Sequence, residues 1–472
     1  MARHAELAEI QLPDFGMPTF EPEIPAEVYR NRLDKLYKIA ADDGLDFFVV
    51  YGDREHSANL VYLTGYDPRF EEALLIIDIK NRLRKPLLLV GNEGLGYTHI
   101  SPIREDLEIV LYQTFSLMGQ PRDSTGHLWE ILDTLGMVEG SYVGVAGWKS
   151  FTEYEDVTLS AWLEIPSFLG EMLYNQTQIE LRSLVGNRTD ILMDERSGLR
   201  IINEVEQLAR FEFAACFTSQ ALRNVLFGLK PGMTEFEAVQ LMGLNGLPLS
   251  CHLMLSAGPR AFMGLPSPSM RKIGRGEPFT MAYGVWGALN ARAGWVAESA
   301  AELPSDVQDY VEKLVKPYFE AIVAWYEHIG IGVTGGELYD IIHDRIGDPF
   351  FGVTLNPGHY IHLDEWVHSP IYKGSDIKLK SGMALQVDVI PATGTAYFTT
   401  NIEDGIALAD ENLRHEFATK YPEAWGRIQA RRTFMENSLG IRLKPEVLPF
   451  SNIPAYLPPF LLSPRHVMRM VG

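Results

Sequence analysis

The chain has few cysteines, and their arrangement excludes one common class of site. Only two of its 472 residues are cysteines, Cys216 and Cys251. They form neither a C-x-x-C redox motif nor a spacing typical of zinc ligands. Both lie in apolar stretches of sequence, which predicts reduced thiols packed inside a hydrophobic core.

Long apolar runs and an excess of basic residues are also missing. No segment reaches the length of a membrane span. The first 15 residues, MARHAELAEIQLPDF, contain acids and prolines where a secretory signal would have a continuous apolar core. The 62 acids outnumber the 41 bases and give a formal net charge of −21, which makes nucleic acid and anionic membranes unsuitable partners. We therefore expect a cytoplasmic protein that acts on a small molecule.

The length of the chain exceeds what one hydrophobic core holds, so it should divide into two or three domains. Within residues 26–170, short apolar runs such as 45–51 alternate with helical spacing of apolar residues, as in 26–41. This alternation predicts an α/β domain. Residues 1–25, rich in proline and acids, are expected to form an arm, and residues 171–200 a linker.

Residues 201–440 show a different pattern, in which long helices are separated by strand-like runs. Thr234 and Glu237 form the capping box that starts one of these helices. Helices that alternate with a mostly antiparallel sheet predict an α+β domain. Residues 441–472 are rich in proline and in large apolar side chains. We expect this tail to pack against another surface, and a partner subunit is one candidate.

The stretch 355–404 carries the densest set of chemically active side chains. Alternation along an extended chain would place His362, Asp364 and His368 on one face, where an acid can orient a histidine and make it basic. Asp388 and Glu403 lie in apolar strand-like runs, where an unpaired carboxylate is costly to bury. Each must therefore pair with a histidine, a substrate cation or a structural partner. The stretch also contains His359 and Glu365.

The same stretch could instead hold one metal ion, or have no role in chemistry. Imidazole and carboxylate groups are ligands that suit zinc, manganese or iron. A mononuclear site of this kind would draw its ligands from among His362, Asp364, His368, Asp388 and Glu403. The third interpretation is that the histidines are ordinary polar residues of a β-rich loop.

Several motifs, in the correct order, resemble those of the creatinase, prolidase and aminopeptidase P family. They are VYLTGYDPRFEEALLII, LRIINEVEQLARFEFA, LKPGMTEFE and SAGPRAFMGLPSPSMRKIGRGEPFTMAYG, followed by the stretch 355–404. The resemblance covers residues 26–440. It implies an α+β "pita-bread" catalytic domain behind a smaller α/β N-terminal domain. It also implies a homodimer in which the partner's N-terminal domain helps to close the active site.

Peptidases of this family hold two metal ions with two Asp, one His and two Glu, and most of these ligands are missing here. The first Asp falls on Ala282, and the second falls within residues 289–291, where there is no carboxylate. The histidine that begins H-x-x-G-H falls on Leu355. Asp388 and Glu403 match the last two ligands, but two carboxylates cannot hold a dinuclear centre.

Creatinase is the relative that keeps this fold without metal ions and hydrolyses a C–N bond with histidine and glutamate. Its catalytic histidine precedes a G-D turn, and the matching residues 262–264 include no histidine. His359 matches the second histidine of H-x-x-G-H, which binds the substrate and the transition state in the peptidases. Relatives also reach across the dimer from the segment after Y-L-T-G, which here contains Arg69 and Phe70.

These observations favour a metal-independent, creatinase-like hydrolase without a cofactor. It would cleave a C–N bond in a small amide or amidine that carries a carboxylate. The catalytic candidates are His359, Glu365, His368, Asp388 and Glu403. The substrate-binding candidates are Arg260 and Arg292, which could hold a carboxylate through two hydrogen bonds, together with His362, Tyr397, Arg69 and Phe70.

Two alternative functions stay open at this point. The chain could be a catalytically inactive pita-bread protein that binds a ligand or partner through the apolar tail 441–472. It could also be a peptidase or lyase with a rebuilt site for a single divalent metal ion. The first alternative predicts that replacing His359 changes only stability, and the second predicts bound metal.

Overall fold

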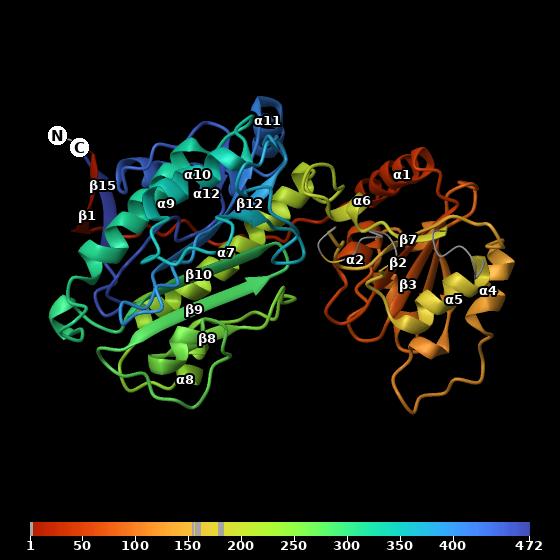
Figure 1. Cartoon of the computed structure of the whole chain (residues 1–472), viewed down its shortest axis with the longest axis horizontal. Coiled ribbons are helices and arrows are strands. Elements are labelled where there is room, and N and C mark those ends of the chain that lie inside the picture. The colour runs from red at the N-terminus through yellow and green to blue at the C-terminus, as the bar shows by residue number, and fades with distance from the viewer. Residues whose placement is uncertain (1–2, 153–154, 156–161, 178–183) are drawn as a thin grey trace. The chain divides into compact units, whose positions relative to one another are not determined.

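The computed structural model describes residues 3–152, 155, 162–177 and 184–472. The chain forms two compact units (Figure 1). We call Ile24–Ile201 the N-terminal unit, and Met1–Glu23 together with Ile202–Gly472 the C-terminal unit. Within the described residues, no helix is both long enough and apolar enough to cross a membrane.

The N-terminal unit is built on a six-stranded mixed sheet with the strand order β5-β4-β3-β2-β6-β7. The strands are β2 (Phe47–Gly52), β3 (Ala73–Asp78), β4 (Leu87–Val90), β5 (Glu108–Leu111), β6 (Val143–Ala146) and β7 (Val185–Asn187). The helices are α1 (Ala26–Asp42), α2 (Ala58–Thr64), α3 (Gly94–Tyr97), α4 (Leu128–Leu135), α5 (Ser167–Thr177) and α6 (Asp190–Met193). This architecture is the α/β class that the alternating pattern predicts.

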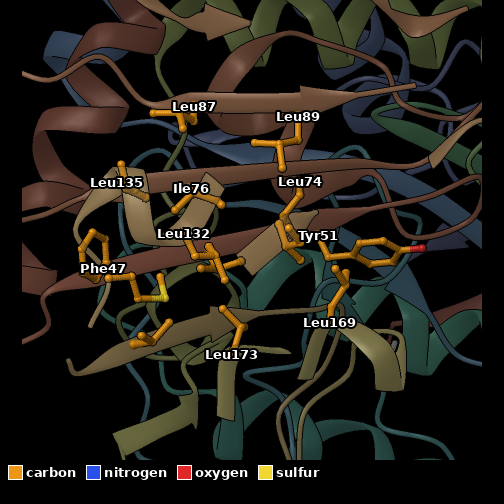
Figure 2. Packing of buried hydrophobic residues seen from close by; sticks show 14 of the residues in the cluster. Phe47, Tyr51, Leu74, Ile76, Leu87, Leu89, Leu132, Leu135, Leu169 and Leu173 are labelled. Atoms are coloured by element: carbon orange, nitrogen blue, oxygen red, sulfur yellow. The ribbon is translucent and has the colours of Figure 1, made fainter. Parts of the chain in front are cut away.

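Apolar side chains of this sheet pack against two helices in one core. Phe47, Leu74 and Leu89 of the sheet belong to the same cluster as Leu132 of α4 and Leu173 of α5 (Figure 2). None of the five is more than 5% exposed. Burying a large aliphatic side chain of this kind stabilises a fold by about 1.5–3 kcal/mol. The central strands β2, β3 and β4 are buried along their whole length, which explains their continuous apolar sequence.

Residues 171–200, predicted to be a linker, contribute to this unit instead. α5 supplies core residues, and β7 pairs in parallel with β6. β7 is an edge strand of three residues, of which only Val185 is buried. It therefore lacks the apolar run by which a strand is recognised in a sequence. Residues 178–183 of this range lie outside the described residues.

The C-terminal unit contains a seven-stranded antiparallel sheet with the order β11-β12-β13-β10-β9-β8, in which β14 also pairs with β13. The strands are β8 (Met254–Ala257), β9 (Pro278–Val285), β10 (Ala288–Trp295), β11 (His359–Tyr360), β12 (Ala384–Asp388), β13 (Asn401–Leu408) and β14 (Val447–Pro449). The α-helices are α7 (Val205–Gly228), α8 (Glu235–Leu241), α9 (Lys316–His328), α10 (Gly335–Ile346), α11 (Glu411–Lys420) and α12 (Pro422–Asn437). This confirms the α+β class.

Two local features of this unit position the sheet and its helices. The amide of Glu237 donates a hydrogen bond of 3.1 Å to the Thr234 hydroxyl at the start of α8, as the capping box predicts. α7 covers one face of the sheet, where the Thr218 hydroxyl donates to Asn290 Oδ1 at 2.7 Å. Because side chains alternate along β10, the neighbouring Ala291 points to the opposite face.

The arm and the tail, predicted as separate segments, pair with each other. β1 (His4–Glu9) and β15 (His466–Val471) form an antiparallel two-stranded sheet that holds both chain ends side by side (Figure 1). The Tyr456 hydroxyl lies 3.0 Å from Ile10 O. Phe450 and Phe460 are buried within the unit, so these tail side chains are not available as a docking surface for a partner.

Candidate active site

The candidate site lies along a row of directly paired residues in the sheet of the C-terminal unit. Asp388 is opposite Glu403, Glu403 is opposite Ala291, and Ala291 is opposite Ala282. Residues that face each other across paired strands point to the same side of the sheet. Two carboxylates and two methyl groups therefore stand in one row, on the side of the sheet opposite to Asn290. The family resemblance places two aspartates at or next to Ala282 and Ala291. These positions lie in the same row as the acids but carry no carboxylate.

β11 brings a histidine to the same face. His359 pairs with Gln386, two residues before Asp388. His359 Nε2 lies 3.1 Å from Glu365 Oε1 and 3.9 Å from both Asp388 Oδ2 and Glu403 Oε1. The imidazole is completely buried. We call His359, Glu365, Asp388 and Glu403 the carboxylate–histidine cluster.

A tight turn, and not an extended run, follows His359. The amide of Tyr360 donates to His368 O at 2.8 Å, and the amide of Val367 donates back to Tyr360 O at 3.1 Å. The turn returns the chain over the imidazole, so that the ring of Trp366 stacks on His359 with 4.1 Å between ring centres and 19° between planes. An extended chain would place His359 and Trp366 on opposite faces, and this turn brings their two rings together.

The predicted face of His362, Asp364 and His368 is consequently wrong. His362 packs edge-to-face against Phe211 of α7, with 5.2 Å between ring centres. His368 Nδ1 accepts a hydrogen bond from the amide of Ser369 at 2.9 Å. None of the three belongs to the group of possible metal ligands found among the described residues. A two-residue strand followed by a turn has no regular alternation, which is why the prediction failed.

Charge and burial together shift the acidity of the cluster. Burial lowers the pKa of His359, but the carboxylates of Glu365, Glu403 and Asp388 outweigh it and raise this pKa well above its usual value. Burial raises the pKa of Asp388 to about 6, against the opposing charge of His359. Burial and the charge of Asp388 raise the pKa of Glu403 well above its usual value. The cluster thus combines one histidine with two acids, and the pKa values of all three are raised.

One hydrogen bond fixes which nitrogen of His359 faces the acids. Nδ1 lies 3.1 Å from Tyr360 O and donates to it. Nε2 therefore points at the carboxylates, whether it carries a proton or a lone pair. The stacked Trp366 holds the plane of the ring. This arrangement suits both proton transfer and metal ligation.

The cluster fits one metal ion and does not fit two. Ligand atoms of His359, Asp388 and Glu403 all lie within 4.8 Å of one another. Asp388 Oδ1 is buried and has no hydrogen-bond partner in the described part of the chain. One imidazole and two carboxylates suit zinc, manganese or iron. A second ion would need oxygen ligands at Ala282 and Ala291, which offer only methyl groups.

The histidine of this group is His359 and not a residue at position 355. The resemblance places a ligand at Leu355, whose side chain is 55% exposed. It gives His359 a separate role in binding the substrate and the transition state. In the structure His359 stands among the acids at a distance that permits ligation.

The two arginines expected to bind a substrate carboxylate are engaged inside the protein. Arg292 points to the opposite side of the sheet from Glu403, and its Nη2 donates to both carboxylate oxygens of Asp404 at 3.0 and 2.8 Å. Arg260 forms an ion pair with Glu235, whose side chain is fully buried. A sequence does not reveal such partners, because they lie 112 and 25 residues away along the chain.

The remaining candidates make contacts of their own. The Tyr397 hydroxyl donates to Asp309 Oδ1 at 2.7 Å, which holds this half-buried ring. Arg69 Nε lies 3.3 Å from Asp67 Oδ1, and Phe70 is 61% exposed. Arg69 and Phe70 belong to the N-terminal unit, while the cluster belongs to the C-terminal unit. Their proposed roles in binding stay predictions.

Two residues near the cluster were not identified from the sequence. Trp366 is one of them, and its position next to Glu365 in the sequence could have indicated that it lies near the cluster. The other is Cys251, which is partly exposed and not a core thiol as predicted. Burial and the charges of Glu365 and Glu403 raise the pKa of Cys251 to about 12. Its position just before β8, whose Met254 continues the row of paired residues, could have pointed to it.

Comparison with known proteins identifies the fold. No protein-family model matches the chain. A curated relative, "Uncharacterized peptidase YqhT" of Bacillus subtilis (strain 168), is 23% identical over 227 residues. The match covers 46% of this chain and 62% of the relative, which is less than two thirds of the relative's length.

Several solved structures are similar over most of their length. The prolidase from Thermococcus sibiricus aligns with a TM-score of 0.61 and 17% identity, covering 81% of this chain and 95% of that chain. The prolidase from Pyrococcus horikoshii OT3 aligns with a TM-score of 0.60 and 16% identity, covering 80% and 95%. The X-Pro aminopeptidase from Thermotoga maritima MSB8 aligns with a TM-score of 0.58 and 15% identity, covering 80% and 95%. The chain thus has the two-domain pita-bread fold of the prolidases and aminopeptidases P, at low sequence identity.

Proposed function

We propose that the protein is a hydrolase that cleaves a C–N bond in a small, non-peptide amide or amidine at the carboxylate–histidine cluster. The observation that carries the proposal is that three carboxylates lie within 3.9 Å of Nε2 of one buried imidazole. Groups of this kind exchange protons with a bound substrate. The curated relative is named a peptidase and the similar structures are prolidases and an aminopeptidase, which supports the cleavage of a C–N bond.

The cluster contains the groups that such a reaction needs. Water must lose a proton as its oxygen bonds to the carbon, and the leaving nitrogen must gain one as the C–N bond breaks. The Glu365 side chain is 25% exposed, so it is the carboxylate that water reaches and it acts as the base. His359, whose pKa is raised, supplies the proton to nitrogen. Asp388 and Glu403 stabilise the charged imidazole.

The charge of the site favours a cationic substrate such as an amidine. Three acids surround a single imidazole, so the cluster stays rich in acids even when His359 is protonated. Buried carboxylates are stabilised by a nearby cation. A carboxylate on the substrate, expected from the sequence, has no support, because Arg260 and Arg292 pair with acids of the protein.

A second candidate is a hydrolase or lyase that uses one divalent metal ion. The close approach of the ligand atoms favours it. His359, Asp388 and Glu403 would hold the ion, which supplies Lewis acidity and an activated water when bound. Glu365 remains the group that moves protons in this candidate too.

Metal analysis combined with an activity screen tests both candidates. The purified protein is assayed against a panel of small amides and amidines, before and after dialysis against EDTA, by NMR detection of the cleaved products. We expect hydrolysis that survives chelation and falls by about 10²–10⁴ in His359→Gln and in Glu365→Gln. His343→Gln is the matched control, because His343 stacks on Tyr339 of its own helix, α10.

Each result favours one function. Two ions per chain in the purified protein contradict the proposal. One ion per chain, lost in Glu403→Gln together with the activity, establishes the second candidate. No hydrolysis of any compound, with His359→Gln altering stability alone, points to the inactive binding protein.

We include a homodimer and a cytoplasmic location in the proposal, since the family resemblance implies the first and the composition the second. The exposed Phe70 is the side chain expected to reach the partner. Light scattering during gel filtration should give a mass close to twice the 53.1 kDa of one chain. The mass of a single chain would contradict the dimer.

A further inference from the structure

A cavity of about 480 Å³ lies in the C-terminal unit, and none of its lining residues belongs to the carboxylate–histidine cluster. Its walls come from four parts of the chain: the arm, the C-terminal half of α7, α8 and the tail. Its volume falls within the range of about 300–1,000 Å³ that is usual for small-molecule sites. The polar residues that line it are Gln11, Arg223, Asn224 and Arg465.

Two guanidinium groups give this cavity a positive charge. Neither Arg223 nor Arg465 forms an ion pair with an acid in the part of the chain that the structure describes, and the lining residues include no carboxylate. Both cations act on the Tyr456 hydroxyl, where they oppose the rise in pKa that burial causes. Both guanidinium groups belong to residues that line the same cavity. In a chain of net charge −21, such a pair is a local exception to the prevailing negative potential.

The polar groups of the cavity are held in place from outside it. Arg223 Nη1 donates to Pro13 O at 2.6 Å, which ties α7 to the arm. Asn224 Oδ1 accepts a hydrogen bond from Gln220 Nε2 at 2.9 Å. The amide of Ile10 donates to the carbonyl of Arg465 at 2.8 Å, which fixes the backbone of the tail there. The guanidinium group of Arg223 is thus oriented before a ligand binds, whereas the exposed side chain of Arg465 is anchored only through its backbone.

An apolar wall completes the cavity. Leu12, Phe227 and Leu241 line it. Phe227 is 41% exposed, and the guanidinium carbon of Arg223 lies 6.0 Å from the centre of its ring. A planar group placed against this ring would have a cation close by and apolar side chains around it.

We propose that this cavity binds a small organic anion, with its carboxylate or phosphate group at Arg223 and Arg465 and its planar apolar part against Phe227. Guanidinium groups bind both kinds of anion through paired hydrogen bonds. The site is separate from the candidate active site, so it would serve a regulatory or storage ligand and not the substrate. The arm and tail would be held more firmly when the ligand is bound.

Calorimetric titration of the full-length protein tests this site with three probes: benzoate, phenyl phosphate and inorganic phosphate. We expect saturable binding of at least one aromatic anion. Benzoate alone would indicate a carboxylate ligand, and phenyl phosphate alone a phosphate ligand. Arg465→Gln should weaken binding about tenfold or more, and this variant leaves the bonds between Arg223 and the arm intact. Phe227→Ala should weaken the binding of the aromatic anions but not the binding of inorganic phosphate.

Two variants control for other sites and for general charge. Arg442→Gln removes an exposed arginine of the same unit that does not line the cavity, and it should bind the probes as the wild type does. His359→Gln should also bind them normally, which separates this site from the active site. No saturable binding of any probe at millimolar concentration, or equal binding by the wild type and Arg465→Gln, would overturn the proposal.

Discussion

Two buried glutamates of the C-terminal unit have opposite environments, and this difference separates a structural acid from a reactive one. Glu212 accepts hydrogen bonds from Arg427 and Arg431 at 2.6 and 2.7 Å. Burial raises the pKa of Glu212, but the two arginines outweigh it and lower this pKa below its usual value. Glu403 faces other acids, and its pKa is raised. The charged form of the first carboxylate is stabilised, and the charged form of the second is disfavoured.

The pairing of Glu212 predicts how stability depends on pH. Glu212→Gln leaves the buried guanidinium group of Arg431 and the partly buried one of Arg427 without their acid, and it should lower the free energy of unfolding at pH 7 by about 3–5 kcal/mol. The pKa of Glu212 in the folded protein lies below the usual 4.5. Its contribution to the free energy of unfolding is therefore complete above pH 4.5 and is lost as the pH falls through the folded pKa. Urea unfolding at pH 7 and at pH 3.5 should therefore show a smaller difference between wild type and variant in acid.

Glu416→Gln is the control for that prediction. Glu416 forms an exposed pair with Lys420, one turn along α11. Removing it should cost no more than about 0.5 kcal/mol at either pH. A Glu212→Gln variant as stable as this control would show that the buried network contributes little.

Among the elements, the register of four strands decides what the candidate site can hold. β9, β10, β13 and β12 place Ala282, Ala291, Glu403 and Asp388 in one row, in which Ala291 is directly opposite Glu403 and Ala282 lies one strand further away. The hairpin of β9 and β10 and the pairing of β12 with β13 are both antiparallel, which keeps these residues opposite one another. The row is thus a property of the sheet and not of any single strand.

This register predicts that a second metal position can be restored. Ala282→Asp combined with Ala291→Asp adds two carboxylates to the row that holds Glu403 and should increase the manganese bound per chain by one ion. Mass spectrometric metal analysis after equilibrium dialysis measures the difference from the wild type. The matched control is Ala282→Asn with Ala291→Asn, which has the same size without the charge. Equal manganese content in the Asp and Asn variants would contradict the predicted row.

Much of the element level was accessible from the sequence, and the turn after β11 was not. Thr234 and Glu237 act within one helical turn, so their capping box could be read locally. The return of Glu365 and Trp366 over His359 depends on two backbone hydrogen bonds that close a turn. The residues of this stretch are compatible with either an extended segment or a turn. The assumption that its side chains alternate between two faces was therefore wrong.

The molecule as a whole divides into two compact units, and each of them buries apolar side chains. Leu132 belongs to the core of the N-terminal unit, and Leu208 on α7 is completely buried in the C-terminal unit. Because each unit buries its own apolar side chains, we expect calorimetry to show two unfolding transitions.

Leucine-to-alanine substitutions in the two cores test this expectation. Leu132→Ala should destabilise one transition and Leu208→Ala the other, each by about 2–5 kcal/mol, through the cavity that the missing atoms leave. Scanning calorimetry of both variants and the wild type measures the two midpoints. A single transition that moves equally in both variants would contradict independent cores.

Helices such as α1 and α8, several buried strands, the fold class and the acids Asp388 and Glu403 followed from patterns within short windows of sequence, because burial periodicity, capping and motif order are local properties. The set of residues that forms the carboxylate–histidine cluster could not be predicted in this way. His359 reaches the acids through strand pairing, and Glu365 reaches His359 through a turn. The partners of Arg292 and the pairing of arm with tail were equally hidden: Tyr456 and Ile10 meet across 446 residues. Such contacts are selected by the packing of the whole unit, which no window of the chain contains.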